Sequence, residues 1–177
     1  MLAADKTLLK KLAPHIERVL VMDPVPTSGK MMIEIMRDFG ARNIASVQKT
    51  TSGLDPVFNF EPQLILTELH GPDFDGLAFI RALRRSRLSQ RMAPVILYTA
   101  DATVDTIKGA RDAGAHEFLR KPYTIKDLFR RVENVVFKPR DWIEAQMYVG
   151  PDRRRFNSES YAGARKRQAE KPAAQAG

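Results

Sequence analysis

The sequence predicts an α/β fold built around a parallel β-sheet, and three features of it support this prediction. Residues 17–23, 62–69 and 93–100 each contain a short apolar run, which is typical of a strand buried on both faces. Segments with apolar residues at helical spacing lie between these runs. Strands and helices therefore alternate along the chain, which is the order that βαβ units require.

Each element can be placed in chain order. A short amphipathic helix lies within residues 1–15, with Leu8, Leu9 and Leu12 on one face and Pro14 as its end. The expected strands are residues 17–23, 43–48, 62–69, 93–100 and 116–122, and the helices are 26–40, 51–60, 74–86, 103–114 and 124–136. This pattern predicts a flavodoxin-like, doubly wound, five-stranded parallel sheet over residues 16–137. A ligand site in such a sheet lies at the carboxyl ends of the strands.

Composition limits the possible functions. The 177 residues contain no cysteine, which excludes disulfides, thiol nucleophiles and thiolate metal sites. The sequence has no signal-peptide pattern and no apolar run of membrane-spanning length, so we expect a cytoplasmic protein without a membrane segment. The net charge is +8, and half of it lies in residues 151–177, where seven basic residues face three acidic ones. Such a basic, aliphatic-poor segment is expected to be a disordered extension that meets anions.

Polar residues follow the predicted strands at the edge of the sheet where a ligand would bind. Asp23, Glu68 and Thr99 stand at three strand ends, and Lys121 precedes Pro122 at a fourth. With the stretches VLVMD, PQLILTELHGPDFDGLAFIRALR, PVILYTA and DAGAHEFLRKPYT in this order, the chain resembles a CheY-type receiver domain of bacterial response regulators.

The resemblance implies functions for these residues, and the sequence departs from them twice. In receivers, an acidic pair and a third-strand aspartate hold Mg²⁺, and that aspartate accepts phosphate; the match implies Thr99 as the switch hydroxyl, Phe118 as the switch aromatic and Lys121 as the phosphoryl partner. Here the first acid is Asp23, the second is replaced by Pro24, and the phosphoacceptor position is Glu68. Because a longer carboxylate is misplaced for in-line attack and Mg²⁺ demands near-ideal octahedral geometry, we expect a degenerate site without metal or phosphorylation. Glu68 would then form a salt bridge to Lys121, or would imitate a phosphorylated aspartate.

Other residues give weaker signals. His15, His70 and His116 have no acid at ligand spacing and are interpreted as surface or loop histidines. The sequence has no Ser/His/Asp order, P-loop or GxGxxG motif, so nothing in it predicts an enzyme. Residues 138–149 place Trp142 and Met147 on one apolar stripe, which predicts a short connecting helix that docks on the receiver.

The predicted ligand-binding tail is residues 150–168, and residues 148–168 contain an imperfect repeat in which Tyr148-x-Gly150 and Tyr161-x-Gly163 each precede a basic cluster. A solvated charge run or a nucleic-acid-binding tail would explain the charge, but neither explains Asp152 beside the arginines. A guanine nucleotide would explain the arginines, Asp152 and the other basic residues together. Arginine pairs bidentately with guanine O6 and N7 and stacks on the ring, Asp152 would accept from the guanine N–H edge, and the other basic residues would neutralise phosphates.

This arrangement points to cyclic di-GMP, and the segment GPDRRRFNSESYAGARKRQ resembles the arginine-rich tail of the Cle proteins, CheY-like regulators of the flagellar motor in alphaproteobacteria. The resemblance implies a tail that orders on an intercalated cyclic di-GMP dimer, and a complex that engages the motor switch protein FliM. Composition separately predicts a disordered terminus over 169–177. It implies ligand contacts from nine residues: Asp152, Arg153, Arg154, Arg155, Asn157, Ser158, Arg165, Lys166 and Arg167. Ala164 departs from the expected proline.

The sequence therefore predicts a non-enzymatic second-messenger effector that is recruited to the flagellar motor to change motility or surface attachment. Two alternatives remain: a phosphorylation-dependent response regulator of a two-component system, and a nucleic-acid-binding protein with a basic arm. The sequence does not indicate ligand stoichiometry, the direction of the motor effect or the oligomeric state.

Overall fold

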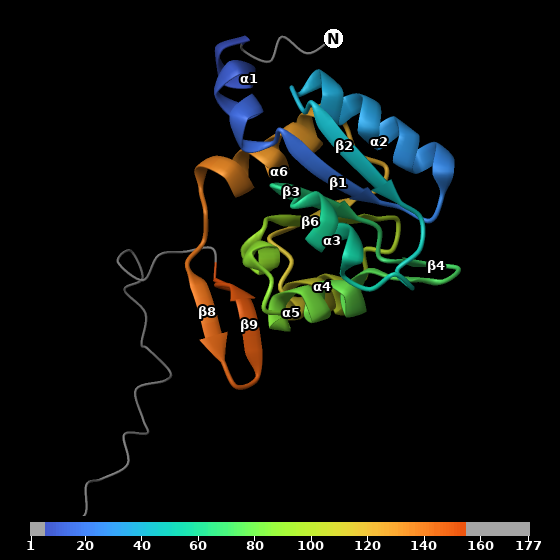
Figure 1. Cartoon of the computed structure of the whole chain (residues 1–177), viewed down its shortest axis with the longest axis vertical. Helices are drawn as coiled ribbons and strands as arrows, with labels where there is room; N and C mark the ends of the chain where they lie inside the picture. Colours follow the sequence, from blue (N-terminus) through green and yellow to red (C-terminus); the bar gives the residue numbers. More distant parts are fainter. Residues whose placement is uncertain (1–5, 155–177) are drawn as a thin grey trace, which may run out of the picture.

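The computed structural model describes residues 6–154. Its centre is a five-stranded, wholly parallel sheet in the order β2-β1-β3-β6-β7. The strands are β1 (Arg18–Met22), β2 (Asn43–Val47), β3 (Leu64–Thr67), β6 (Val95–Thr99) and β7 (Glu117–Arg120). This order confirms the doubly wound, flavodoxin-like fold that the alternating pattern predicted (Figure 1).

Helices cover both faces of the sheet. They are α1 (Lys6–Leu12), α2 (Pro26–Asp38), α3 (Asp55–Phe60), α4 (Gly76–Arg85), α5 (Val104–Ala113) and α6 (Ile125–Phe137). Short 3-10 turns occupy Ala13–His15 and Ser89–Met92, and a minimal hairpin joins β4 (His70–Gly71) to β5 (Phe74–Asp75). The sequence placed the five main strands and five following helices to within a few residues.

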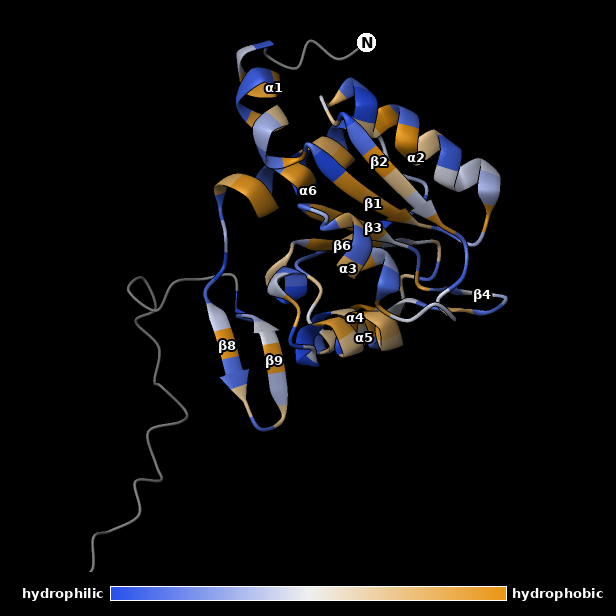
Figure 2. Ribbon diagram, in the orientation of Figure 1, coloured by the Kyte–Doolittle hydropathy of each residue, from blue (hydrophilic) through white to orange (hydrophobic). Residues whose placement is uncertain are grey.

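The two hydrophobic cores lie on opposite faces of the central strands. Val19 and Val21 pack with α2 and α6, while Leu20 and Met22 pack on the other face with α4. Alternation of side chains along β1 explains why the strand reads as a continuous apolar run. Figure 2 shows the hydrophobic residues gathered along these central strands.

Side chains fix several helix starts at the edge that carries the candidate site. Thr103 Oγ1 accepts from the Thr106 backbone N–H at the start of α5, and Asp75 does the same for Ala78 at the start of α4. At the start of α6, Thr124 and Asp127 form a reciprocal capping box. Gly114 ends α5 with a positive φ of 100°, a conformation that glycine adopts without strain.

The connecting segment is not the helix expected for residues 138–149. It forms an antiparallel hairpin of β8 (Trp142–Ala145) and β9 (Tyr148–Pro151), joined by a two-residue turn. The apolar stripe of Trp142, Ile143, Met147 and Tyr148 fits helical spacing, but the same residues also fit two paired strands, and Gly150-Pro151 at the end disfavours a helix.

The boundary of the tail also shifts. Gly150 and Pro151, placed at its start by the sequence, belong to β9. The hairpin contacts α4 and α5, on the side of the molecule away from α2 (Figure 1).

Candidate functional site

Asp23 lies at the carboxyl end of β1 with its carboxylate buried and fully engaged. Oδ1 accepts from the Val25 backbone N–H at 2.8 Å, and Oδ2 accepts from the Ser28 hydroxyl at 2.6 Å and the Tyr98 hydroxyl at 2.9 Å. Only 1% of Asp23 is exposed. Buried charges need such partners, because desolvating an unpaired carboxylate costs several kcal/mol or more.

Lys121 joins the first and third strand ends through its ammonium group. Its Nζ donates to Glu68 Oε2 at 2.6 Å, to Ser28 Oγ at 3.1 Å and, more weakly, to Asp23 Oδ2 at 3.4 Å. A lysine ammonium has three N–H donors, so all three are used. The remaining Glu68 oxygen, Oε1, accepts from the Leu69 backbone N–H at 2.7 Å. The predicted Glu68–Lys121 salt bridge is therefore confirmed.

Two tyrosine side chains, Tyr98 and Tyr123, lie next to this network. The Lys121 ammonium lies 4.6 Å from the centre of the Tyr98 ring. Burial, together with the nearby Asp23 carboxylate, raises the pKa of Tyr98 far above its usual value, so its hydroxyl stays a proton donor. Burial, with Asp23 and Glu68, also raises the pKa of Tyr123 to about 12.

The other predicted receiver-site residues do not share side-chain hydrogen bonds with this network, although the Lys121 backbone N–H donates to the Thr99 backbone oxygen at 2.7 Å. Thr99 is buried, and its Oγ1 accepts from the Asp101 backbone N–H at 3.2 Å. Phe118, on β7, packs partly buried against the α4 side of the core. Pro24 occupies the space beside Gly71, where an added Cβ would meet the proline Cγ at 2.5 Å. Ser28 and Tyr98 were missed by sequence reasoning, although Tyr98 is adjacent to Thr99 and Ser28 lies in the first turn of the helix that follows the first strand.

In this arrangement each carboxylate oxygen and the ammonium already have hydrogen-bond partners inside the protein. The residues present therefore fit poorly with a Mg²⁺ site, because Pro24 supplies no side-chain carboxylate and Lys121 places a positive charge between the two acids. Across residues 6–154, no group of three or more His, Asp or Glu side chains is arranged to hold a metal ion. The network is well suited to holding β1, β3 and β7 together.

A second cluster of charged side chains lies where the hairpin meets the receiver body. Arg84 is 1% exposed and donates to the backbone oxygens of Gly114 (2.9 Å), Ala93 (3.0 Å) and Arg91, with its guanidinium also facing the Trp142 ring at 5.5 Å. Burial lowers the pKa of Arg84 to about 10, which still leaves it charged at neutral pH.

His116 is a loop residue but does not lie on the surface, which corrects that part of the sequence interpretation. Its Nδ1 accepts from the Val95 backbone N–H at 3.2 Å and faces Arg84 Nη2 at 3.2 Å. Burial first, and then the charges of Arg84 and Arg140, lower the pKa of His116 well below 6.5. The imidazole is therefore neutral, with Nδ1 as acceptor. The burial of His116 could have been inferred from its position one residue before β7, a strand that pairs with β6.

The first residues of the arginine-rich segment are fixed against α5. Arg153 Nη1 donates to Asp112 Oδ1 at 2.9 Å, and its guanidinium stacks 4.5 Å from the centre of the Tyr148 ring. Arg140 Nη1 donates to the Asp152 backbone oxygen at 3.1 Å, and Asp152 Oδ1 accepts from the Arg154 backbone N–H at 2.9 Å. Of the nine predicted ligand contacts, Asp152, Arg153 and Arg154 are thus close together. The other six lie outside the described residues: Arg155, Asn157, Ser158, Arg165, Lys166 and Arg167.

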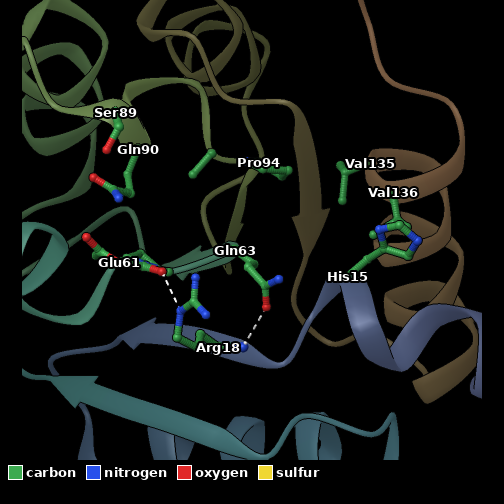
Figure 3. Close-up of a pocket in the computed structure, with 11 residues that line it drawn as sticks. His15, Arg18, Glu61, Gln63, Ser89, Gln90, Pro94, Val135 and Val136 are labelled. Atoms are coloured by element: carbon green, nitrogen blue, oxygen red, sulfur yellow. Dashed lines mark hydrogen bonds between the residues drawn. The ribbon is translucent and has the colours of Figure 1, made fainter.

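A shallow depression of about 430 Å³ lies at the opposite end of the sheet, at the amino ends of the strands (Figure 3). Its polar groups hold the chain together: Gln63 Oε1 accepts from the Arg18 backbone N–H at 3.0 Å, and Arg18 Nε donates to the Glu61 oxygen at 2.8 Å. It is not part of either cluster above. No helix within residues 6–154 has the length and apolar character needed to cross a membrane.

Comparison with known proteins agrees with this geometry. The family model described as "Response regulator receiver domain" matches residues 19–133. The chain is 26% identical over 118 residues to the Chemotaxis protein CheY of Pseudomonas aeruginosa, covering 67% of this chain and 94% of that protein. It is 27% identical over 124 residues to the Transcriptional regulatory protein PdtaR of Mycobacterium tuberculosis, covering 70% of this chain and 58% of that protein.

Solved structures agree at the level of the fold. The chemotaxis protein CheY4 of Vibrio cholerae superimposes with a TM-score of 0.61 at 18% identity, over 68% of this chain and 99% of that one. A putative response regulator from Chloroflexus aurantiacus gives 0.63 at 21% identity, over 70% and 99%. The matched segment includes Asp23, Glu68, Thr99 and Lys121, and the matching model covers most of the chain. The chain belongs to the response regulator receiver domain family.

Proposed function

We propose that this protein is a non-enzymatic effector that binds cyclic di-GMP through the segment from Asp152 to Arg167 and then engages the flagellar motor switch protein FliM. The observation that carries the proposal is the contrast between two sites. The receiver network around Lys121 has its acceptors and donors matched internally, whereas Asp152, Arg153 and Arg154 gather at the start of a strongly basic segment. Ligand binding is therefore assigned to the segment and not to the strand ends.

Calorimetry of the full chain with cyclic di-GMP tests the proposal directly. We expect saturable binding at micromolar concentrations. A flat titration would reject the assignment of this ligand. A further expectation is that ligand-bound protein is captured by FliM more strongly than ligand-free protein, because a ligand that binds one ordered form shifts the population toward it.

Asp152→Asn separates guanine recognition from simple charge attraction. Asn keeps an oxygen that can accept from Arg154 N–H, so the local turn is preserved while one negative charge is removed. A site that only attracts phosphate would bind more tightly, whereas a site that reads the guanine N–H edge would bind more weakly. Asp55→Asn, an exposed acid at the start of α3, is the control with the same charge change.

Arg154→Lys tests base reading by the arginines. Arg154 is exposed, and lysine preserves its charge but not its planar fork or its stacking surface. Loss of one good bidentate base contact should weaken binding by about 1–3 kcal/mol. Equal affinity of the Lys variant would show that Arg154 contributes charge alone.

Phosphorylation is the rival supported by the family itself. A phosphorylation-dependent receiver would incorporate label from acetyl phosphate at Glu68. We expect none, because Glu68 is 9% exposed and its two oxygens are engaged by Lys121 and Leu69. Labelling at Glu68 would place the chain among conventional two-component regulators.

A further inference from the structure

The aromatic ring of Tyr148, on β9, is held in one position by the residues that follow it. Tyr148 is 7% exposed, and its hydroxyl donates to the backbone oxygen of Pro151. The ring lies so close to Gly150 that a Cβ added to this glycine would be 2.7 Å from the tyrosine oxygen. Glycine therefore leaves the room that the ring needs, and the Tyr-x-Gly pattern fixes an aromatic ring just ahead of the basic cluster.

Arg153 lies over this ring and is held in a second place as well. Its guanidinium carbon is 4.5 Å from the centre of the Tyr148 ring, and its Nη1 donates to Asp112 Oδ1 at 2.9 Å. The chain just before it is also fixed, because the Asp152 backbone N–H donates to the Asp141 backbone oxygen at 2.7 Å. The folded body therefore sets the position of the first tail guanidinium.

We propose that Tyr148 is a positioning residue for the nucleotide: it supports one face of the Arg153 guanidinium, so that the opposite face stacks on a guanine of cyclic di-GMP. A guanidinium is planar and stacks on aromatic rings. The Arg153 side chain is 44% exposed, which leaves surface that a base can reach. The inference rests on the proposed function and adds a residue outside the nine assigned to the ligand.

The support increases affinity by reducing what binding must order. A free arginine side chain has many rotamers, and a ligand that stacks on it must select one of them. The contacts with Tyr148 and Asp112 make this selection before the ligand arrives. The contact with Tyr148 uses the face of the guanidinium and not its N–H groups, so it persists when a base stacks on the other face.

A double-mutant cycle in the full chain, measured by calorimetry with cyclic di-GMP, tests this role. Tyr148→Leu and Tyr148→Met each remove the ring but keep an apolar side chain, and we expect about fivefold weaker binding. Tyr148→Phe keeps the ring and should bind within about twofold of wild type. With Arg153→Lys already present, losing the ring should change affinity by under about twofold, because an ammonium has no planar face to hold. Tyr123→Leu, which removes a tyrosine packed elsewhere on the core, is the control and should bind like wild type.

The outcomes distinguish this inference from the proposed function. If loss of the ring weakens binding by the same factor with Arg153 and with Lys at that position, Tyr148 acts only on the folding of the hairpin. The positioning role is then rejected, and binding by the tail stands. Binding by Tyr148→Phe as weak as that by Tyr148→Leu would also reject the role, since the hydroxyl and not the ring would matter. A wild-type chain that does not bind cyclic di-GMP would reject the proposed function and this inference together.

Discussion

The two charged regions of the molecule differ in how their charges are arranged. Around Lys121, one ammonium meets two carboxylates and a hydroxyl, with further backbone and tyrosine donors to the acids. Beside α5, the guanidiniums of Arg111 and Arg153 share the single carboxylate of Asp112. The first region joins three strand ends, whereas the second lies at the start of the segment to which the proposed function assigns the ligand.

The largest expected effect comes from the buried guanidinium that supports the hairpin junction. Arg84→Leu leaves the backbone oxygens of Gly114, Arg91 and Ala93 without their donor, and we expect a loss of about 4 kcal/mol in the free energy of unfolding. Urea unfolding at neutral pH measures it. The neighbouring Arg85 is exposed, so Arg85→Leu is the control, and equal losses would contradict the structural role of Arg84.

Lys121→Met tests whether the strand-end network is a support. Removing the ammonium leaves Asp23 and Glu68 close together and unneutralised, and we expect a loss of about 3 kcal/mol, near the lower limit for breaking a buried pair because Lys121 is partly exposed. Adding Glu68→Gln should restore part of it. Lys49→Met breaks the exposed pair with Asp73 and should cost under about 1 kcal/mol. Similar losses for both lysines would refute the assignment.

His116 should make stability depend on pH below 6.5. Its pKa is lower in the folded protein than in the unfolded chain, so below pH 6.5 the unfolded state binds more protons and stability falls, by up to about 1.4 kcal/mol per pH unit. Above pH 6.5 this stabilisation is complete. His116→Asn offers an acceptor that does not titrate, so the difference between wild type and variant should disappear as pH falls. A constant difference from pH 7.5 to 5 would rule out this titration.

The smallest effect concerns the anchor of β9. The Tyr148 hydroxyl donates to the Pro151 oxygen, and Tyr148→Phe should lose about 1 kcal/mol while keeping the ring that Arg153 stacks on. Tyr123 provides the comparison, because within the described residues its buried hydroxyl has no hydrogen-bond partner. Tyr123→Phe should therefore cost nothing. Equal losses of stability for Tyr123→Phe and Tyr148→Phe would contradict the different hydrogen bonding assigned to the two hydroxyls.

Sequence reasoning located the sheet because its signals are local. The apolar runs around Leu20 and Leu66, and the stop at Gly114, each depend on a few neighbouring residues. The Glu68–Lys121 pair was also predictable, since parallel strands end at one edge of the sheet.

Long-range packing explains what the sequence did not reveal. Trp142 and Tyr148 fit a helix or a hairpin equally well by spacing, and the difference is made by contacts with α4 and α5. Likewise, Asp112 and Arg111 read as ordinary exposed helix charges until the chain near Arg153 is placed beside them. No local sequence pattern indicates that residues so far apart in the chain come into contact.

The folded body of this receiver extends beyond the residues matched by the family model, because it includes the hairpin. The family match stops at residue 133, yet β9 continues to Pro151. Gly150 in β9 packs closely on Gly114, because a Cβ added to Gly150 would lie 3.1 Å from the Cα of Gly114. Trp142, on the other strand, faces the guanidinium of Arg84. We therefore expect the cooperative folding unit to extend beyond the matched residues 19–133, and we expect a chain cut at residue 133 to expose Arg84 to solvent. Hydrogen exchange should find the amides of β9 opening together with those of β7, as parts of one body.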